Sequence, residues 1–251
     1  YILFSYFLKK DDPDIIHETY FDSNNLNILK DKIKIITIYD LIHEKYSKFY
    51  SKDKSLEKKK ILKNVDHFVC ISKKTQNDFI SYYNVPYKKT SVIYLGCDHL
   101  KQYKKKNNFK LNDKYFLFVG DRYGYKNFKI LCKAMNKSKI LKDVKLVCFG
   151  GGKFSNDEIK KFNIKNNFLN YQGDDHLLSN LYKGALAYIN TSSYEGFGIP
   201  NLEAMYLRCP VITSDFSVFK EIGGNANLYF KEGDYKDLAN KMIYFLKKKN
   251  R

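Results

Sequence analysis

Short apolar segments alternate with amphipathic segments along most of the 251-residue chain. The apolar segments are about as long as β-strands, and the amphipathic ones repeat their apolar positions with the period of a helix. This alternation is typical of parallel sheets with helices on both faces. Residues 115–119, Tyr-Phe-Leu-Phe-Val, are apolar throughout, which favours a strand that is covered on both sides. We therefore predict an α/β fold built from doubly wound sheets.

The pattern predicts strands at residues 14–17, 33–38, 67–71, 91–95, 115–119, 145–149, 168–171, 185–190, 210–213 and 226–229. It predicts helices at residues 56–63, 74–83, 127–135, 176–183, 216–222 and 235–248, and a further short helix that begins near Pro200.

The least periodic part of the chain runs from Cys97 to Asp113 and contains the run Lys-Lys-Lys-Asn-Asn at 104–108. The lysine run favours a solvated linker over a phosphate-binding patch. We therefore expect a partial N-terminal Rossmann-like domain at 1–97, a linker at 98–113 and a complete Rossmann-like domain at 114–251. The chain has no initiator methionine and begins inside what we expect to be a helix, so we expect it to be a fragment.

The formal charge of +18 is carried mostly by lysine. It is consistent with a solvated lysine surface, and also with contact to an anionic membrane or a nucleic acid. A nucleic-acid-binding protein should present arginine-rich faces with aromatic platforms. Here the lysines are dispersed and the tyrosines fall mostly at core periods, so nucleic-acid binding is disfavoured.

Five cysteines occur, and no pair has the spacing of a metal site or a redox motif. This favours free thiols in a reducing compartment, and we expect a cytoplasmic protein. No apolar run approaches the roughly 20 residues that span a bilayer, and the first eight residues lack the basic region of a signal peptide.

The segment from Glu195 to Glu203 follows an expected strand and combines two carboxylates, two glycines and a helix start. The glycines leave backbone N–H groups open, and a helix N-terminus favours anions. Glu203 sits among apolar helix residues, where a carboxylate should be paired or should bind a ligand hydroxyl. We expect this loop to hold an anionic, polyhydroxylated ligand.

Two other strand ends carry candidate chemistry. Arg122 and Lys126 follow the strand at 115–119, at the edge where ligands of doubly wound sheets bind, and two cations there can neutralise a diphosphate. Gly150 to Gly152 follow the strand at 145–149 and would let a ligand approach the backbone. They lack the Gly-x-Gly-x-x-Gly spacing of dinucleotide-binding proteins, and a plain loop explains them equally well.

The segment from Glu195 to Met205 resembles the Glu-x7-Glu motif of retaining glycosyltransferases of family 4, which have the two-domain GT-B fold. Residues 119–127 are similar to the segment that supplies the diphosphate-binding Arg and Lys there. Four N-terminal stretches also resemble the family, at residues 14–21, 37–44, 69–75 and 92–96. The resemblance covers nearly the whole chain, although the start of the N-terminal domain and the C-terminal helix of the family are missing.

The resemblance implies that Arg122 and Lys126 hold the donor diphosphate, that Glu195 contacts the donor sugar and that Glu203 binds the ribose. We count Glu195, Arg122 and Lys126 as catalytic. It implies further donor contacts from Gly150, Gly151, Tyr171, Gln172, Gly196, Phe197, Gly198, Ile199, Pro200, Asn201 and Leu202. Both glutamates are then hydroxyl-binding groups, unlike the acid/base pair of a glycoside hydrolase, which flanks the scissile bond.

The implied reaction is the retaining transfer of a hexose from a nucleoside-diphosphate sugar to a glycan or lipid-linked acceptor, without a cofactor. Cations placed at the phosphate stabilise the leaving group, and they make a divalent metal unnecessary. Asp12 and Asp14 precede a strand, so we interpret them as part of a turn and not as metal ligands. Residues 19–21 and 40–44 resemble bacterial mannosyltransferases of lipopolysaccharide assembly, which favours GDP-mannose over a UDP-sugar as donor. The positive charge would suit peripheral docking on the inner face of an anionic membrane.

Two N-terminal positions bear on the activity. Family members often carry a His where this chain has Tyr39, which keeps a non-catalytic nucleotide-sugar-binding relative as the alternative. His17 lies at the end of an expected strand, where a structural role is favoured over a place in the active site.

Overall fold

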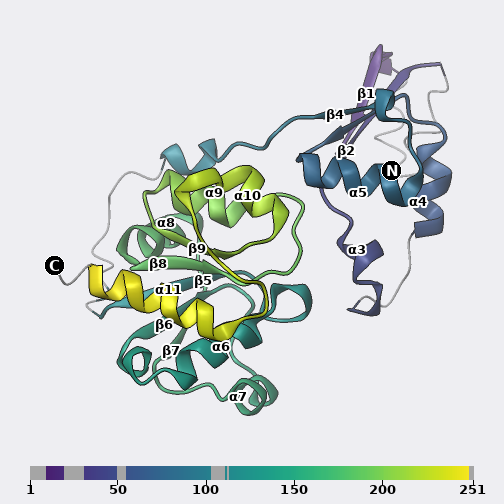
Figure 1. Ribbon diagram of the computed structural model, residues 1–251. Helices are drawn as coiled ribbons and strands as arrows, with labels where there is room; N and C mark the ends of the chain where they lie inside the picture. Colours follow the sequence, from purple (N-terminus) through teal and green to yellow (C-terminus); the bar gives the residue numbers. More distant parts are fainter. Residues whose placement is uncertain (1–9, 20–30, 50–54, 103–110, 112, 249–251) are drawn as a thin grey trace. The chain divides into compact units, whose positions relative to one another are not determined.

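The computed structural model of the protein describes residues 10–19, 31–49, 55–102, 111 and 113–248 (Figure 1). The chain divides into two compact units, Tyr1–Leu95 and Gly96–Arg251. Each unit contains one sheet, and all paired strands are parallel. The predicted α/β fold is thus confirmed. The helix expected at the start of the chain lies outside the described residues.

The sheet of the first unit has the order β1-β2-β3-β4, formed by Ile15–Glu18, Ile33–Ile38, His67–Cys70 and Thr90–Val92. Its helices are α3 (Ile42–Lys45), α4 (Ser55–Leu62) and α5 (Lys73–Tyr83). Buried apolar residues of β2, β3 and α5 form the core, among them Ile36, Phe68 and Phe79. The Ser72 side chain begins α5 by accepting a 2.9 Å hydrogen bond from the amide of Thr75.

The sheet of the second unit has the order β10-β9-β8-β5-β6-β7. In chain order, its strands are Tyr115–Val119, Lys145–Phe149, Phe168–Tyr171, Ala187–Asn190, Val211–Ser214 and Leu228–Phe230. The chain first builds outwards from β5 through β6 to β7, and then returns to the other side of β5 with β8. The order is that of doubly wound nucleotide-binding sheets, which bind their ligands where the direction of building reverses. Here the reversal lies between β5 and β8.

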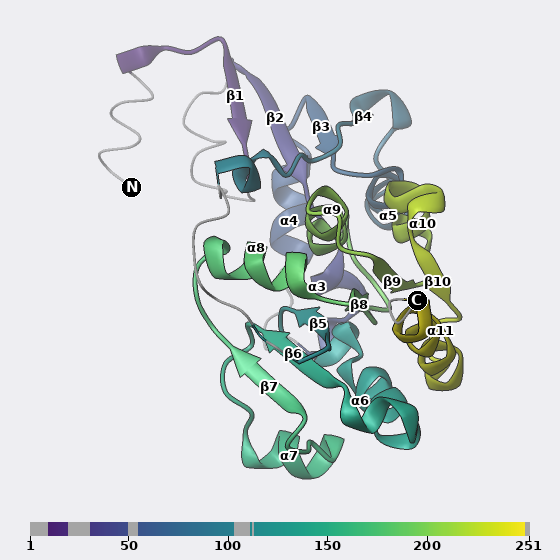
Figure 2. The ribbon, with the colours of Figure 1, turned by 90° about the vertical axis from the view of Figure 1, so that its left-hand side faces the viewer.

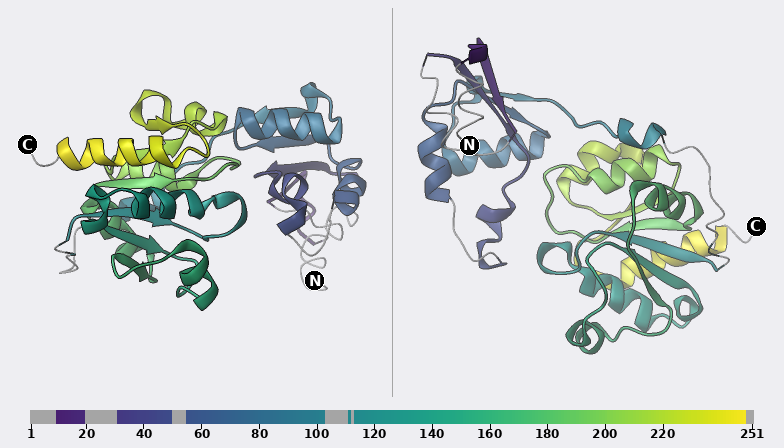
Figure 3. Two further views of the ribbon diagram at one scale, coloured as in Figure 1. Left: turned by 60° about the horizontal axis from the view of Figure 1, so that its bottom comes forward. Right: turned by 180° about the vertical axis from the view of Figure 1, so that it is seen from behind.

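Helices cover both faces of this sheet (Figures 2 and 3). They are α6 (Phe128–Lys137), α7 (Asn156–Phe162), α8 (Asp175–Gly184), α9 (Ile199–Tyr206), α10 (Ser217–Gly223) and α11 (Tyr235–Lys248). Phe116 and Phe118 of β5 pack with residues of α6 and α11, whereas Tyr115 and Leu117 pack with residues of α8 and α9. Burial on both faces is why β5 is apolar at every position.

The strand predictions hold at all ten places: four strands match the predicted bounds exactly, and the ends of the others differ by at most three residues. The short helices α3 and α7 were not predicted. Residues Asp98–Gln102, expected to be part of a linker, form a 3-10 helix in which Leu100 is buried. The chain divides two residues before the expected linker, because this helix belongs to the second unit.

Candidate functional site

The predicted residues that follow β5 and β8 meet where the order of the second sheet reverses. β5 leads to Lys126, and β8 leads to Glu195. The Lys126 ammonium lies 2.6 Å from Oε1 of Glu195, and both side chains are largely buried. Two further hydrogen bonds join the loops: the Thr191 hydroxyl donates to the Lys126 carbonyl at 2.8 Å, and the Ser193 amide donates to the Tyr125 carbonyl at 2.8 Å. The structure thus brings together the cation expected at a diphosphate and the carboxylate expected at a sugar.

A third predicted residue, Glu203, lies on α9 with 10% of its side chain exposed. The Tyr182 hydroxyl donates to its Oε2 atom at 3.0 Å, and Nε2 of His99 lies 3.2 Å from its Oε1 atom. Burial raises the pKa of Tyr182 well above its ordinary value, and the neighbouring Tyr188 and Glu203 raise it further, so the hydroxyl keeps its proton and donates. Sequence reasoning missed both His99 and Tyr182.

Buried amide side chains of Asn190 and Asn201 hold the loop between β8 and α9 in place. Asn201 accepts a 2.8 Å hydrogen bond from Nδ2 of Asn190, and Oδ1 of Asn190 accepts from the Ser192 amide at 3.0 Å. Gly198 precedes α9 with φ of +88°, and a Cβ there would lie 2.9 Å from the ring of Phe219. Only glycine fits this conformation without strain.

The other residues of this loop present themselves in different ways. Phe197 is buried, so its side chain belongs to the core and only its backbone is left for a ligand. Ile199 is exposed, whereas Leu202 is half-buried. The donor contacts predicted for Gly196, Phe197, Ile199, Pro200 and Leu202 remain predictions.

Arg122 is placed differently from the other predicted cation. The residue is 3% exposed, and its guanidinium donates to both carboxylate oxygens of Glu158, at 2.8 and 3.1 Å. It also donates to four successive carbonyls, those of residues 150 to 153. Its carbon atom Cζ lies 4.6 Å from the centre of the Phe154 ring. The expected contact with a diphosphate stays a prediction, and in this structure the side chain is occupied by other partners.

The glycines after β6 lie beside the end of β7. Both segments were predicted to contact the donor. The Gly150 amide donates to the Tyr171 carbonyl at 3.1 Å. Gln172 follows directly, and its Nε2 atom is 3.7 Å from the place where a Cβ on Gly152 would lie. Gly150 and Gly152 therefore lie beside Tyr171 and Gln172, at the carboxyl edge of the neighbouring strands β6 and β7.

The two N-terminal positions have local partners. Nε2 of His17 lies 2.8 Å from the Thr37 hydroxyl on the neighbouring strand, a contact that agrees with the structural role favoured from the sequence. Tyr39 is 40% exposed, and its carbonyl oxygen is 3.4 Å from the Thr75 hydroxyl.

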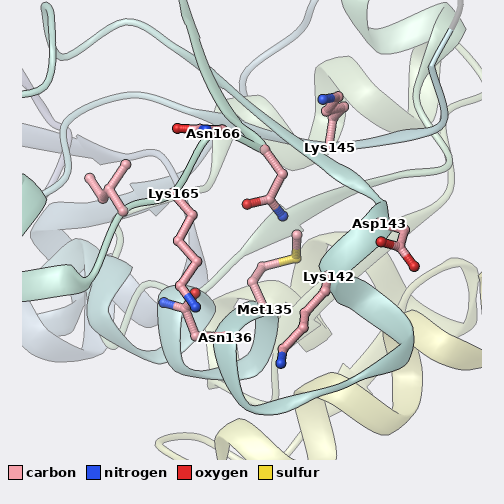
Figure 4. A pocket seen from close by; sticks show the side chains of 9 residues that line it. Met135, Asn136, Lys142, Asp143, Lys145, Lys165 and Asn166 are labelled. Carbon is pink, nitrogen blue, oxygen red and sulfur yellow. The ribbon is translucent and has the colours of Figure 1, made fainter.

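A cavity of about 710 Å³ lies at the other end of the second sheet, where β6 and β7 begin (Figure 4). Its walls include three lysines whose ammonium groups do not meet at one point, and no predicted site residue. Its lining is Met135, Asn136, Lys142, Asp143, Lys145, Ile164, Lys165, Asn166 and Asn167.

Within the described part of the chain, no group of three or more His, Cys, Asp or Glu side chains is arranged to hold a metal ion. The five cysteines are buried and unbridged. None of the helices described here is both long enough and apolar enough to cross a bilayer.

Comparison with known proteins places the chain in a family. Residues 101–251 match the model described as glycosyl transferases group 1. The chain belongs to this family. Residues 2–100 match the model of glycosyltransferase family 4. The two matches together cover nearly the whole chain.

Among curated relatives, this group 1 chain is 30% identical over 214 residues to an O-antigen chain mannosyltransferase of Salmonella typhimurium, covering 80% of this chain and 57% of that protein. It is 31% identical over 170 residues to an uncharacterized glycosyltransferase of Methanocaldococcus jannaschii, covering 61% of this chain and 43% of that one. The chain thus spans about half the length of these relatives.

Solved structures show the fold. A sucrose-phosphate synthase from Thermosynechococcus elongatus is similar with a TM-score of 0.76 and 21% identity, over 97% of this chain and 67% of that one. An Anabaena protein in complex with UDP and glucose is similar with a TM-score of 0.75 and 17% identity, over 96% and 71% of the two chains. These likenesses confirm the predicted GT-B fold.

Proposed function

We propose that the protein to which this chain belongs transfers a hexose, with retention of configuration, from a nucleoside-diphosphate sugar to a glycan or lipid-linked acceptor. The observation that carries the proposal is the 2.6 Å contact between Lys126 and Glu195, where the strand order reverses. Nucleotides bind at this place in doubly wound sheets. The names of the relatives, which include mannosyltransferases of O-antigen chains, support mannose as the sugar, and we propose GDP-mannose as the donor.

Lys126 can serve the donor without losing Glu195. An ammonium group has three N–H donors, so it can bond to Glu195 and to a phosphate oxygen at once. Breaking the bond between sugar and diphosphate builds negative charge on the phosphate, and a fixed cation there lowers the barrier. Glu195 then lies next to the bound phosphate, where we propose that it contacts a hydroxyl of the attached sugar. One ion pair therefore positions both halves of the bond that breaks.

Glu203 is suited to the ribose. An ionised carboxylate has about four acceptor positions on its two oxygens. Tyr182 and His99 use one on each oxygen, which leaves one on each for the two ribose hydroxyls. Tyr182 also fixes the rotamer of the carboxylate before the donor arrives, and this lowers the entropic cost of binding.

The positive charges at the phosphate come from Lys126 and from the N-terminus of α9, and we propose that no divalent metal is required. The net charge of +18 supports a peripheral location on the cytoplasmic face of an anionic membrane, where a lipid-linked acceptor would be found.

Calorimetry of the chain with GDP, UDP and ADP tests the proposal. We expect one of the three to bind, with affinity reduced at least about tenfold by Glu203→Ala and unchanged by Asp143→Asn, because Asp143 lines the cavity at the other end of the sheet. If none of the three binds, the proposal is wrong.

Transfer or hydrolysis of the matching donor sugar by the full-length protein then decides between an enzyme and a non-catalytic relative. Product formation from GDP-mannose supports the enzyme. Binding without turnover supports the non-catalytic alternative.

A further inference from the structure

Every donor of the Arg122 guanidinium has an acceptor inside the protein. A guanidinium has five N–H groups. Nε donates to Oε1 of Glu158 at 2.8 Å. Nη1 donates to the carbonyls of Gly150 and Gly152, at 3.1 and 3.0 Å. Nη2 donates to the carbonyls of Gly151 and Lys153 and to Oε2 of Glu158, at 3.0, 3.2 and 3.1 Å. A phosphate oxygen would have to displace one of these acceptors.

We propose that Arg122 is a positioning residue: it holds the loop from Gly150 to Lys153 in the shape that receives the nucleotide, and it does not itself bind the diphosphate. The inference rests on the proposed function for the identity of the ligand. Lys126 is then the side-chain cation that contacts the diphosphate.

The conformation of the loop supports this role. Gly150, Gly151 and Gly152 have φ of +88°, +65° and +73°, values that residues other than glycine rarely adopt. A Cβ on Gly151 would lie 2.9 Å from Nη1 of Arg122. The glycines are therefore explained by the need to wrap the backbone closely around the guanidinium.

The wrapping turns one set of backbone groups outwards. In a planar trans peptide, the N–H of one residue points opposite to the carbonyl of the residue before it. Because the carbonyls of residues 150 to 152 point at Arg122, the N–H groups of residues 151 to 153 point away from it. Gly151 and Lys153 are exposed, so this face of the loop reaches solvent. Successive N–H groups on one face form a site suited to an anion or to the acceptors of a base.

Glu158 completes the arrangement from the first turn of α7. The Arg122 guanidinium beside it, together with the Ser155 amide and hydroxyl, holds the pKa of Glu158 below its usual value. Glu158 also forms a capping box with Ser155, so the start of α7 and the glycine loop share one anchor. The charge of the buried Arg122 is thus compensated before any ligand arrives.

Two measurements test the proposal with Arg122→Gln, Arg122→Lys and Glu158→Gln. The first needs no ligand. Hydrogen exchange of the α7 amides should become at least about threefold faster in all three variants, because each removes part of the Arg122–Glu158 pair. Lys126→Gln should leave this exchange unchanged. Unchanged exchange in both Arg122 variants would overturn the positioning role of Arg122, even if the chain binds no nucleotide.

The second measurement compares the nucleoside diphosphate that binds with its own nucleoside: GDP with guanosine, UDP with uridine or ADP with adenosine. If Arg122 positions the loop, the Arg122 variants and Glu158→Gln should weaken the binding of nucleoside and of nucleoside diphosphate by the same factor, about fivefold or more. Lys126→Gln should weaken the nucleoside diphosphate and spare the nucleoside.

The opposite pattern would overturn the proposal. A direct diphosphate ligand predicts that Arg122→Gln weakens only the nucleoside diphosphate, that Arg122→Lys restores part of the affinity through its charge, and that Glu158→Gln has no effect. If none of GDP, UDP and ADP binds the wild-type chain, the proposed function fails, and the exchange measurement still decides the role of Arg122.

Discussion

Tyr182→Phe removes one hydroxyl from the side chain that positions Glu203. The Tyr182 ring is fully buried and packs against Tyr188 with 5.6 Å between ring centres. Its hydroxyl lies 3.0 Å from Oε2 of Glu203 and 3.3 Å from the Pro200 carbonyl. Phenylalanine preserves the volume of the ring, so the change tests the hydrogen bond with little effect on packing.

The expected cost follows from the charge and burial of the acceptor. A hydrogen bond to a charged group contributes about 1.5–3 kcal/mol, and of the two contacts described above Glu203 keeps the one with His99 when the hydroxyl is lost. For a unit of this size, about 1 kcal/mol lowers Tm by roughly 2–4 °C. We therefore expect Tm of the second unit to fall by about 3–12 °C. The pKa of Tyr182 lies well above its usual value, so the hydroxyl stays protonated and the loss should not vary between pH 6 and pH 9.

The assay is a double-mutant cycle read by denaturant unfolding of the full chain. Tyr182→Phe should cost about 1.5–3 kcal/mol in the wild-type background and less than about 1 kcal/mol in the Glu203→Ala background, because the acceptor is then missing. Tyr206→Phe is the matched control, since this tyrosine is exposed on α9, and it should change stability by less than about 0.5 kcal/mol. Equal costs in the two backgrounds would refute the coupling.

Three other changes have defined outcomes. Lys126→Gln should weaken nucleoside-diphosphate binding about tenfold or more, and calorimetry should find no effect of Lys129→Gln on α6. Gly198→Ala should cost at least about 1 kcal/mol in denaturant unfolding, because φ is +88° there, whereas Gly96→Ala should cost less, since nothing lies within 4 Å of its added Cβ. Burial raises the pKa of the Cys70 thiol to about 12, so alkylation at pH 8, followed by mass spectrometry, should label Cys70 only after unfolding.

The sequence predicted the strands well because their signal is local. Buried parallel strands need apolar side chains on both faces, and β5 shows this at every position, so its bounds were predicted correctly. The helix α7 was missed because it is only seven residues long and buries none of them fully. Its capping box, Ser155 and Glu158, was visible in the sequence and is the signal that could have found it.

The site was predicted only as far as strand ends allow. Lys126 and Glu195 follow strands that become neighbours, so their meeting could be expected from a doubly wound order. The partners of Glu203 could not, because His99 and Tyr182 are 104 and 21 positions away in the chain. No local pattern encodes such a contact.

Arg122 marks a different limit of sequence reasoning. The pattern placed a cation after β5, but it could not say which way the side chain points. That direction is set by carbonyls of the loop after β6 and by Glu158, some 28 to 36 positions later.

The charges of the site make the backbone more important than its cations. The proposed donor site holds Glu195 and Glu203 against Lys126 alone, because Arg122 is already neutralised by Glu158. A diphosphate adds further negative charge to a site in which two carboxylates face one ammonium group. The compensation has to come from backbone N–H groups at the start of α9, which carry partial positive charge. Gly198 precedes this helix with φ of +88°, a conformation that favours glycine. This glycine is therefore part of the electrostatics of the site as much as of its shape.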